Sequence, residues 1–518
     1  MLKNIKKVII IIIISIMCGI IFFYQTKKVG FHEDEIYTIT SSVNSDNGLM
    51  VAYGEDNIPK WLTKEYVKNY ITLSHNNYLN LKSIYLNQAY DNHPPLFYTL
   101  VHFSSILFNG EFTKYNAFIV NLIAFILSCL VIINVLKLLD KENLIVGTLI
   151  FYGLSMGTIS MVIYQRMYML LTFFILLYFY YSLKIYKNDF TMTKKTTIQL
   201  GIITVLGFLT QYFFAIYAFL IYTLMLIKMI KCKKDKKTIT KYANSHIVYA
   251  IIGIVLFVPC IYHILFSTRG LSNLNNLNYF THFYEYLKHL AYSFTINNTN
   301  TILMLSVLLI FFVGLILLIK KSIEKFVILL TIIPSIIYFF IATKLTSLQE
   351  LRYIMPVIPF ISIIVFLIFD TLFKFKYKNA VIILIVIILS LNGFIFSKPK
   401  FLFEEYRNYL EIAEQNKDKD FVYVYDNSFN HMQSIPEMMI YEKTLIINTN
   451  KDELQYVLNN DELNSENSYI LCIKSYIDND WILNEIKNNT DFKNIIELYK
   501  SNVFSSEIIS NNLYLISK

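Results

Sequence analysis

The chain has 518 residues, of which 55% are hydrophobic and 16% aromatic, and its mean hydropathy is +0.48. This composition is too apolar for a soluble globular protein and indicates a membrane protein with many spans. The net charge of +9 does not indicate nucleic-acid binding, because no basic stripe with interleaved aromatic residues occurs. The five cysteines are scattered and indicate neither a disulfide framework nor a zinc site.

Apolar segments long enough to cross a bilayer recur along residues 1–396. A hydrocarbon core of about 30 Å requires roughly 20 apolar residues per helix, or about 17 with favourable flanks. The first segment follows three lysines and lacks a small-residue cleavage site, so it is expected to be an uncleaved anchor. We predict about eleven spans, at residues 8–24, 115–136, 144–163, 167–183, 198–211, 213–227, 246–266, 301–319, 326–343, 354–370 and 379–396.

The lysines predict the orientation of these spans, because basic residues near span ends remain on the cytoplasmic side. With the N-terminus inside, the inside segments hold 22 lysines and no arginine. A twelfth span at residues 94–109 would reverse every later loop and place the lysine-rich segment 228–237 outside. We therefore expect residues 94–109 to form an amphipathic helix at the outer interface.

Polar side chains gather on the face that this orientation places outside. The acids Glu33, Asp34 and Glu35 follow the first span, and His93 precedes two prolines in the segment DNHPPLFYTL. The segments YQRMY and QELRYIMP lie at outer ends of later spans. Each segment alone is also compatible with solvated acids, a helix start or an interfacial anchor. Their joint occurrence on one face favours a functional site.

Arginine is rare, and all four arginines are expected outside. A planar, permanently charged fork is suited to gripping a phosphate or a carboxylate. Chance is the alternative, because few outside basic residues are needed. The four are Arg166, Arg269, Arg352 and Arg407.

In this order and spacing, the segments HEDE, DNHPPLFYTLVHF, YQRMYMLL, LTQYFF and RYIMPVIP resemble the polytopic GT-C glycosyltransferases of the protein O-mannosyltransferase and aminoarabinose transferase type. The resemblance covers roughly residues 1–396. YQRMY lacks an acid that many relatives carry, and Gln211 stands where relatives often have histidine. The resemblance implies a GT-C fold and an enzyme that transfers a sugar from a polyprenyl-phosphate carrier to an acceptor on the non-cytoplasmic face, with inversion.

The local chemistry fits such a transfer. An acceptor hydroxyl must lose its proton as it attacks, and a positioned carboxylate can accept that proton. The resemblance points to Asp34 as this base, with Glu35 as a second catalytic carboxylate and Glu33 as a solvated neighbour. A lipid phosphate is a stable leaving anion, so it needs cationic groups more than a general acid.

Substrate binding is assigned to residues around the outer arginines. Arg352 is the first choice for the phosphate and Arg166 the second, and His93, Tyr168 and Tyr353 complete the predicted phosphate- or sugar-binding set. No cofactor is assigned with certainty. A divalent metal ion held by Asp34, Glu35 and His93 is an open alternative, because these candidate ligands have no fixed spacing.

Three outer segments lie beside these motifs. The first outer loop, residues 25–114, contains WLTKEYVKNYITL and NLKSIYLNQAY, which are expected to form interfacial or ordinary soluble helices. The second, residues 267–300, contains THFYEYLKHLAYSF, another expected interfacial helix. Residues 397–518 carry a net charge of −8 and form an expected extracytoplasmic α/β domain with a structural or acceptor-binding role. Its predicted strands are FVYVYD, TLIINT, YILCIKSY and NLYLIS, and its predicted helices are DELQYVLNN and WILNEIKNN.

The predicted fold class is thus an α-helical polytopic membrane protein with a small C-terminal α/β domain. The expected location is a bacterial cell membrane, and the expected partners are a polyprenyl-phosphate sugar, membrane lipid and an unidentified acceptor. A lipid-linked glycan polymerase or ligase is an alternative, which the identity of the donor would discriminate. A transporter is disfavoured because ionisable residues cluster at one face and no internal repeat is visible.

Overall fold

The computed structural model has two compact units. The first, which we call the helical unit, comprises Met1–Thr26, Asn92–Phe97 and Phe118–Lys400. The second, which we call the sheet unit, comprises Lys27–Asp91, Tyr98–Ala117 and Phe401–Lys518. The structure describes residues 2–45, 61–266, 279–294, 301–322, 324–346, 350–375, 377–426, 429–449, 461–502 and 510–518.

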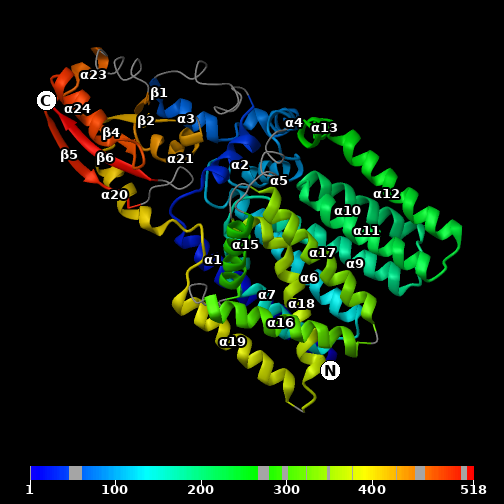
Figure 1. The fold of residues 1–518 in the computed structure, drawn as a ribbon. Helices are drawn as coiled ribbons and strands as arrows, with labels where there is room; N and C mark the ends of the chain where they lie inside the picture. Colours follow the sequence, from blue (N-terminus) through cyan, green and yellow to red (C-terminus); the bar gives the residue numbers. More distant parts are fainter. Residues whose placement is uncertain are drawn as a thin grey trace. The chain divides into compact units, whose positions relative to one another are not determined.

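The helical unit is built from long apolar helices that pack side by side (Figure 1). Among the described residues, nine helices are long and apolar enough to cross a membrane. A tenth span is formed if α7 (Ile145–Gly153) and α8 (Met156–Ile163), which meet at 60°, cross together. The nine helices lie within α1 (Leu2–Lys27), α6 (Asn116–Leu138), α9 (Tyr168–Lys187), α11 (Phe213–Lys231), α12 (Lys236–Leu256), α16 (Thr301–Lys321), α17 (Lys325–Leu345), α18 (Ile358–Leu372, with the preceding turn) and α19 (Lys378–Phe396).

Each of the eleven expected spans falls on a helix or on the bent pair, although two differ in detail. The expected span at 198–211 corresponds to α10 (Lys194–Thr210). With 17 residues, α10 is shorter than each of the nine helices above. The expected span at 246–266 was placed about ten residues too late. Its helix, α12, begins in a polar segment and ends before Pro259, and a short helix, α13 (Cys260–Leu265), follows. Proline at that point cannot continue the hydrogen-bond ladder.

The segments that were expected to lie along the interface are also helical. Residues 94–109 contain α5 (Leu96–Ile106), whose 11 residues are too few to cross a bilayer. The aromatic segment of the second outer loop forms α15 (Tyr279–Ser293). The short length of α5 agrees with the prediction that residues 94–109 do not form a span, and the interfacial location of both helices remains a prediction.

The sheet unit contains a six-stranded mixed sheet with strand order β1-β3-β2-β4-β6-β5 (Figure 1). The three central strands run parallel, whereas the outer pairs β1–β3, β4–β6 and β5–β6 are antiparallel. The strands are β1 (Trp61–Thr63), β2 (Asp420–Tyr425), β3 (Lys443–Asn448), β4 (Ser468–Lys474), β5 (Asn494–Tyr499) and β6 (Asn511–Ser517).

The side chains of a strand alternate between the two faces of a sheet. Both faces of this sheet carry apolar side chains, and helices cover both. Phe421 and Tyr423 of β2 belong to a core that includes residues of α2 (Glu33–Val43), α3 (Lys64–Ile71), α20 (Arg407–Gln415) and α21 (Phe429–Met438). Val422 and Val424 belong to the opposite core, with residues of α23 (Asp461–Ser465) and α24 (Asn479–Asn489).

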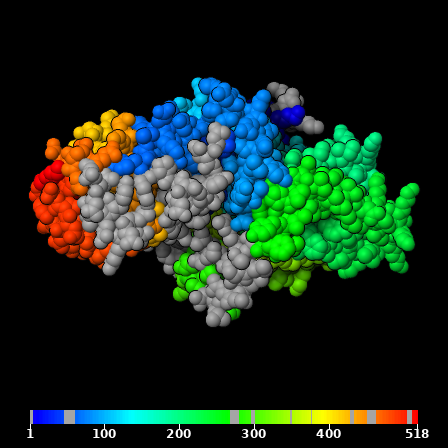
Figure 2. Space-filling view, turned by 90° about the horizontal axis from the view of Figure 1, so that it is seen from above, coloured from blue at the N-terminus to red at the C-terminus, as the bar shows by residue number. Residues whose placement is uncertain are grey.

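The first loop therefore packs with the C-terminal segment, whereas the sequence-based division grouped residues 25–114 with the spans. β1 extends the sheet by pairing with β3, so that WLT is a strand and only the residues after it form α3. Figure 2 shows the blue surface of the first loop beside the orange surface of the C-terminal residues, in agreement with the pairing of β1 and β3. The segment NLKSIYLNQAY of this loop forms α4 (Leu81–Tyr90), as expected.

The α/β character of the tail is confirmed. The four predicted strands correspond to β2, β3, β4 and β6, and WILNEIKNN corresponds to α24. The predicted helix DELQYVLNN lies outside the described residues. Strand β5 was not predicted, because it is an edge strand whose side chains are all half-buried or exposed and form no buried apolar face.

A buried carboxyl on α21 makes the stability of the sheet unit depend on pH. Glu437 is 2% exposed and accepts a hydrogen bond from the Asn511 amide at 2.9 Å. Burial raises the pKa of Glu437 from 4.5 to about 7, which corresponds to about 3 kcal/mol. Because the folded state binds the proton more tightly than the unfolded state, stability is lost as the pH rises from about 4.5 to about 7.

Glu437→Gln is expected to remove this part of the pH dependence, because glutamine keeps an acceptor for Asn511 and carries no charge. Hydrogen exchange of the β4 and β6 amides at pH 5 and pH 8 measures the effect. The wild type should exchange faster at pH 8, after correction for the intrinsic rate, and the variant should show a smaller difference. An equal difference in both proteins would contradict the assignment to Glu437.

Candidate active site

The acid cluster occupies the first turn of α2, and a capping box determines where this helix begins. The Asp34 N–H donates to Nδ1 of the N-cap residue His32 at 3.1 Å. In return, the His32 N–H donates to Oε2 of Glu35 at 2.8 Å. This reciprocal arrangement satisfies two backbone donors that a helix start leaves without intrahelical partners. The three acids therefore have fixed and different surroundings.

Glu35 is fully buried and ion-paired. Its Oε2 lies 3.0 Å from Nζ of Lys28, and neither side chain has exposed surface. Lys28 also donates to the carbonyl of Phe401 at 2.6 Å, and its ammonium lies 5.3 and 5.1 Å from the ring centroids of Phe31 and Phe403. Burial lowers the pKa of Lys28, and the Glu35 carboxylate opposes this shift. The contacts of Glu35 are thus those of a group that holds the chain in place.

Lys28→Met is expected to destabilise the start of α2 by about 3–5 kcal/mol, because it leaves the Glu35 carboxylate buried without its counter-charge. The double variant Lys28→Met/Glu35→Gln should recover most of this loss, since glutamine keeps an acceptor for the His32 N–H. Hydrogen exchange of the α2 amides measures both effects. Lys27→Met, which alters the exposed neighbouring lysine, is the matched control. Equal protection in Lys28→Met and the control would contradict the prediction.

Asp34 differs from Glu35 in its exposure. Its side chain is 28% exposed, and Oδ2 lies 3.8 Å from Nδ1 of His32. Nδ1 of His32 accepts the Asp34 N–H at 3.1 Å, and its 3.8 Å separation from Oδ2 is too long for a hydrogen bond. Of the two acids that were predicted to be catalytic, Asp34 is the one whose carboxylate a reactant can approach.

Glu33 is not the solvated neighbour that the sequence suggested. It is half-buried, and its Oε2 accepts a hydrogen bond from Nε2 of Gln433 at 3.0 Å. The two residues are 400 positions apart in the sequence. They meet because α2 packs against α21 in the sheet unit.

In the helical unit, the break between α8 and α9 brings two predicted binding residues together. Arg166 lies in this break and is 2% exposed. Its guanidinium nitrogen Nη2 lies 3.2 Å from Nε2 of the half-buried His93, which therefore accepts the hydrogen bond. A buried Asn121 on α6 donates to the carbonyl of Tyr164 at 2.7 Å and so supports the break from a neighbouring helix.

The second predicted arginine lies on η5 (Leu351–Val357), a 3₁₀ segment that precedes α18. Arg352 is 2% exposed and donates to the hydroxyl of Tyr164. Its guanidinium carbon lies 5.7 Å from the Tyr164 ring centroid and 5.0 Å from that of Tyr353. The Tyr168 and Tyr353 rings meet edge to face at 5.6 Å. We call these four residues with Arg166 and His93 the arginine–tyrosine cluster.

This cluster has the composition of an anion site. Two permanently charged guanidinium groups are held in a buried environment, where an anion interacts with them more strongly than it does in water. Tyr164 belongs to the YQRMY motif, but no binding role was predicted for it. Asn121 was also missed, although a polar side chain inside an apolar span is a signal for function. Arg269 lies outside the described residues.

No metal site is evident in the part of the chain that the structure describes, because no three His, Cys, Asp or Glu side chains gather there in a suitable group. Asp34, Glu35 and His93 were the predicted ligands. Glu35 has Lys28 as its ion-pair partner and His93 accepts from Arg166. A metal role for these three residues remains an untested prediction.

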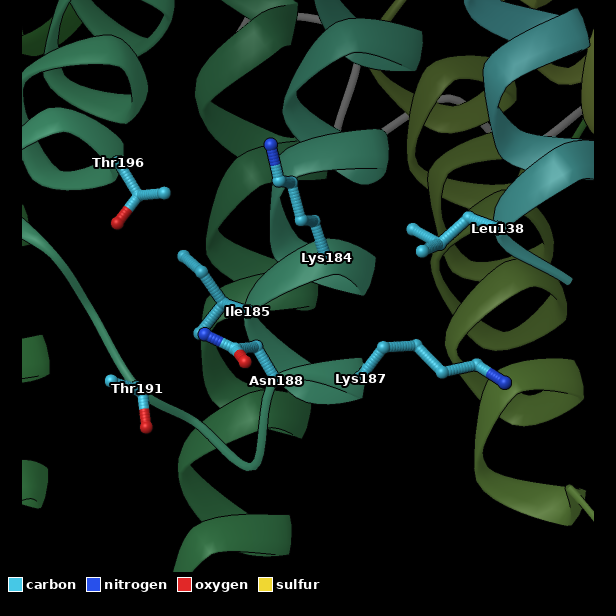
Figure 3. Close-up of a pocket in the computed structure, with 7 residues that line it drawn as sticks. All are labelled: Leu138, Lys184, Ile185, Lys187, Asn188, Thr191 and Thr196. Atoms are coloured by element: carbon cyan, nitrogen blue, oxygen red, sulfur yellow. The ribbon is translucent and has the colours of Figure 1, made fainter.

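A surface pocket of about 370 Å³ lies elsewhere in the helical unit (Figure 3). Lys184 and Lys187 line it, together with residues of the loop that follows α9. Tyr168 begins α9 and Lys187 ends it, so the pocket and the arginine–tyrosine cluster occupy opposite ends of a helix roughly 30 Å long. None of the predicted site residues lines this pocket.

Comparison with solved structures gives matches over nearly the whole chain. The structure of ArnT from Cupriavidus metallidurans in the apo state matches with a TM-score of 0.57 and 10% identity, over 98% of this chain and 97% of that one. The same protein bound to undecaprenyl phosphate matches with a TM-score of 0.53 and 11% identity, over the same shares. The chain has the GT-C fold. This result confirms the fold class that the ordered motifs predicted.

The GT-C fold also accounts for a third match. The oligosaccharyltransferase of Archaeoglobus fulgidus has a TM-score of 0.50 and 11% identity, over 94% of this chain and 72% of that one. Neither the comparison with protein-family models nor that with curated protein sequences gave a match. At these identities the comparisons establish the shared fold alone, and the activity and substrates of this chain have to be inferred from its residues.

Proposed function

We propose that the chain transfers a sugar from a polyprenyl-phosphate carrier to an acceptor hydroxyl on the non-cytoplasmic face of a membrane. The observation that carries this proposal is the arginine–tyrosine cluster, with two buried guanidinium groups in a GT-C fold. A solved protein of the same fold is bound to undecaprenyl phosphate, which supports a lipid phosphate as the anion.

The cluster supplies what the leaving group needs. A polyprenyl phosphate leaves as an anion, and fixed guanidinium groups stabilise the charge that develops on it. Arg352 and Arg166 are the proposed phosphate-binding residues. His93 orients Arg166 through their 3.2 Å contact, and Tyr168 and Tyr353 are the proposed sugar- or phosphate-binding aromatic residues.

Asp34 is the proposed general base. The acceptor oxygen attacks the anomeric carbon of the sugar, and its proton passes to the Asp34 carboxylate. The bond between the anomeric carbon and the phosphate oxygen breaks, and its electron pair leaves with the polyprenyl phosphate. A single displacement of this kind inverts the anomeric configuration. Glu35, which is buried against Lys28, serves in this proposal to position Asp34 and does not react.

The direction of transfer is part of the proposal. The lysines in the expected inside segments support a cytoplasmic N-terminus, and with eleven spans the C-terminal residues would then lie outside. Lys184 and Lys187, at the end of α9 opposite to Tyr168, follow the same rule. The high content of Asn, Lys, Ile and Tyr is compatible with an AT-rich bacterial genome, which supports a bacterial cell membrane as the location.

The donor class can be tested with purified protein. Undecaprenyl phosphate is expected to raise the unfolding temperature, undecaprenol should have little effect, and Arg352→Met should abolish the rise. Equal stabilisation by undecaprenol would contradict phosphate recognition. Stronger stabilisation by undecaprenyl diphosphate than by the monophosphate would instead favour the lipid-linked glycan polymerase or ligase.

A further inference from the structure

The C-terminal segment reaches the acid cluster through a chain of buried polar side chains. Gln433 of α21 is 1% exposed, and Lys474 at the end of β4 has no exposed surface. Nζ of Lys474 donates to Oε1 of Gln433 at 2.6 Å. Nε2 of Gln433 donates to Oε2 of Glu33 at 3.0 Å. An ammonium group has donors only, so Lys474 determines that the Gln433 amide presents its NH₂ group to Glu33.

Such a chain is costly to bury, because an amide or an ammonium group removed from water loses its hydration. The cost is offset only while every member keeps its partner. When it is ionised, Glu437 opposes the lowering of the Lys474 pKa by burial.

This series of hydrogen bonds ends at Glu33, the first residue of α2. Glu33 precedes Asp34 directly, while Ile36 and Ile39 of the same helix belong to the core that also contains Ile435 of α21. The first turn of α2 is therefore held twice. The capping box holds it from its own side, and Gln433 holds it from the C-terminal segment.

We propose that Gln433 and Lys474 are positioning residues for sugar transfer, which act through Glu33 to hold the Asp34 carboxylate in its reactive orientation. This inference rests on the proposed function, because it takes Asp34 as the base. It gives the C-terminal segment a role in the reaction itself, in addition to the structural or acceptor-binding role that its sequence suggested.

A carboxylate swap tests the contact. Gln433→Glu places two carboxylates against each other and is expected to lower kcat by about 10- to 100-fold, as a small displacement of a reacting group does, with little change in the KM for the donor. In the double variant Gln433→Glu/Glu33→Gln, the new glutamine donates to the new glutamate, and Lys474 donates to the same glutamate. The swap should restore kcat to within a few-fold of wild type.

The assay uses the full-length protein in membranes of a deletion strain, which supply the acceptor, with the lipid-linked sugar fraction of that strain as titrated donor. Gln415→Glu, at an exposed glutamine of α20 in the same unit, controls for the added charge. Unfolding temperatures identify variants that lose kcat because they unfold.

Two outcomes would overturn the inference. One is a wild-type kcat in folded Gln433→Glu, and the other is a swap that refolds to the wild-type unfolding temperature without restoring kcat. The proposed function fails by a different result. If Asp34→Asn transfers sugar at the wild-type rate, Asp34 is not the base, whatever the Gln433 variants do. If Asp34→Asn is inactive and Gln433→Glu is normal, only the positioning role is lost.

Discussion

Asp34→Asn lowers the rate of sugar transfer by about 10²–10⁴-fold if Asp34 is the general base, which is the range that positioned acid–base groups contribute. Asparagine has nearly the same size as aspartate but cannot accept the proton of the acceptor hydroxyl. The fold should tolerate the change, because the capping contact with His32 uses the Asp34 backbone N–H and not its side chain. The rate is measured as loss of label from the lipid-linked sugar in deletion-strain membranes.

The control for this variant is Glu65→Gln, which removes an exposed carboxylate from α3 in the same unit. It should transfer sugar at the wild-type rate. Glu35→Gln provides a second comparison, because it should act mainly on stability through Lys28. A rate for Asp34→Asn within two-fold of the control would exclude Asp34 as the base.

Arg352→Lys is expected to lower transfer by about 10²–10³-fold, the effect of removing one preorganised donor to a developing anion. Lysine keeps the charge, but its single ammonium group cannot donate to Tyr164 and a phosphate with the geometry of the guanidinium fork. The substitution also removes the contacts of the planar guanidinium group with the rings of Tyr164 and Tyr353. Transfer rates at several donor concentrations show whether binding or turnover is lost.

Arg407→Lys is the matched control, because Arg407 is exposed at the start of α20 and takes no part in the arginine–tyrosine cluster. It should leave transfer unchanged. If Arg352→Lys were as active as this control, a planar fork at position 352 would not be required, and the phosphate-binding role would have to pass to Arg166.

The elements that the sequence predicted well are those with a strong local pattern. Long apolar runs give the helices of the helical unit, and short β-branched and aromatic runs give β2, β3, β4 and β6. The elements that it missed depend on neighbours. β1 exists because β3 offers a free edge to WLT, and β5 is an edge strand without a buried face.

The same distinction applies to the candidate site. The motifs predicted a shared outer face, but not that Arg166 would contact His93 or that Arg352 would contact Tyr164. The different environments of Glu33, Asp34 and Glu35 were not predictable, because they come from Gln433, His32 and Lys28. A contact between residues 400 positions apart leaves no trace in a single sequence.

The most direct test of sugar transfer by this chain compares a deletion strain that carries the wild type with one that carries Asp34→Asn, at equal membrane abundance. Mass spectrometry measures the polyprenyl-phosphate sugars and the surface glycans of both strains. We predict that the variant strain loses one surface sugar and accumulates the corresponding polyprenyl-phosphate monosaccharide, which would identify the donor. Identical pools in both strains would contradict transfer that depends on Asp34.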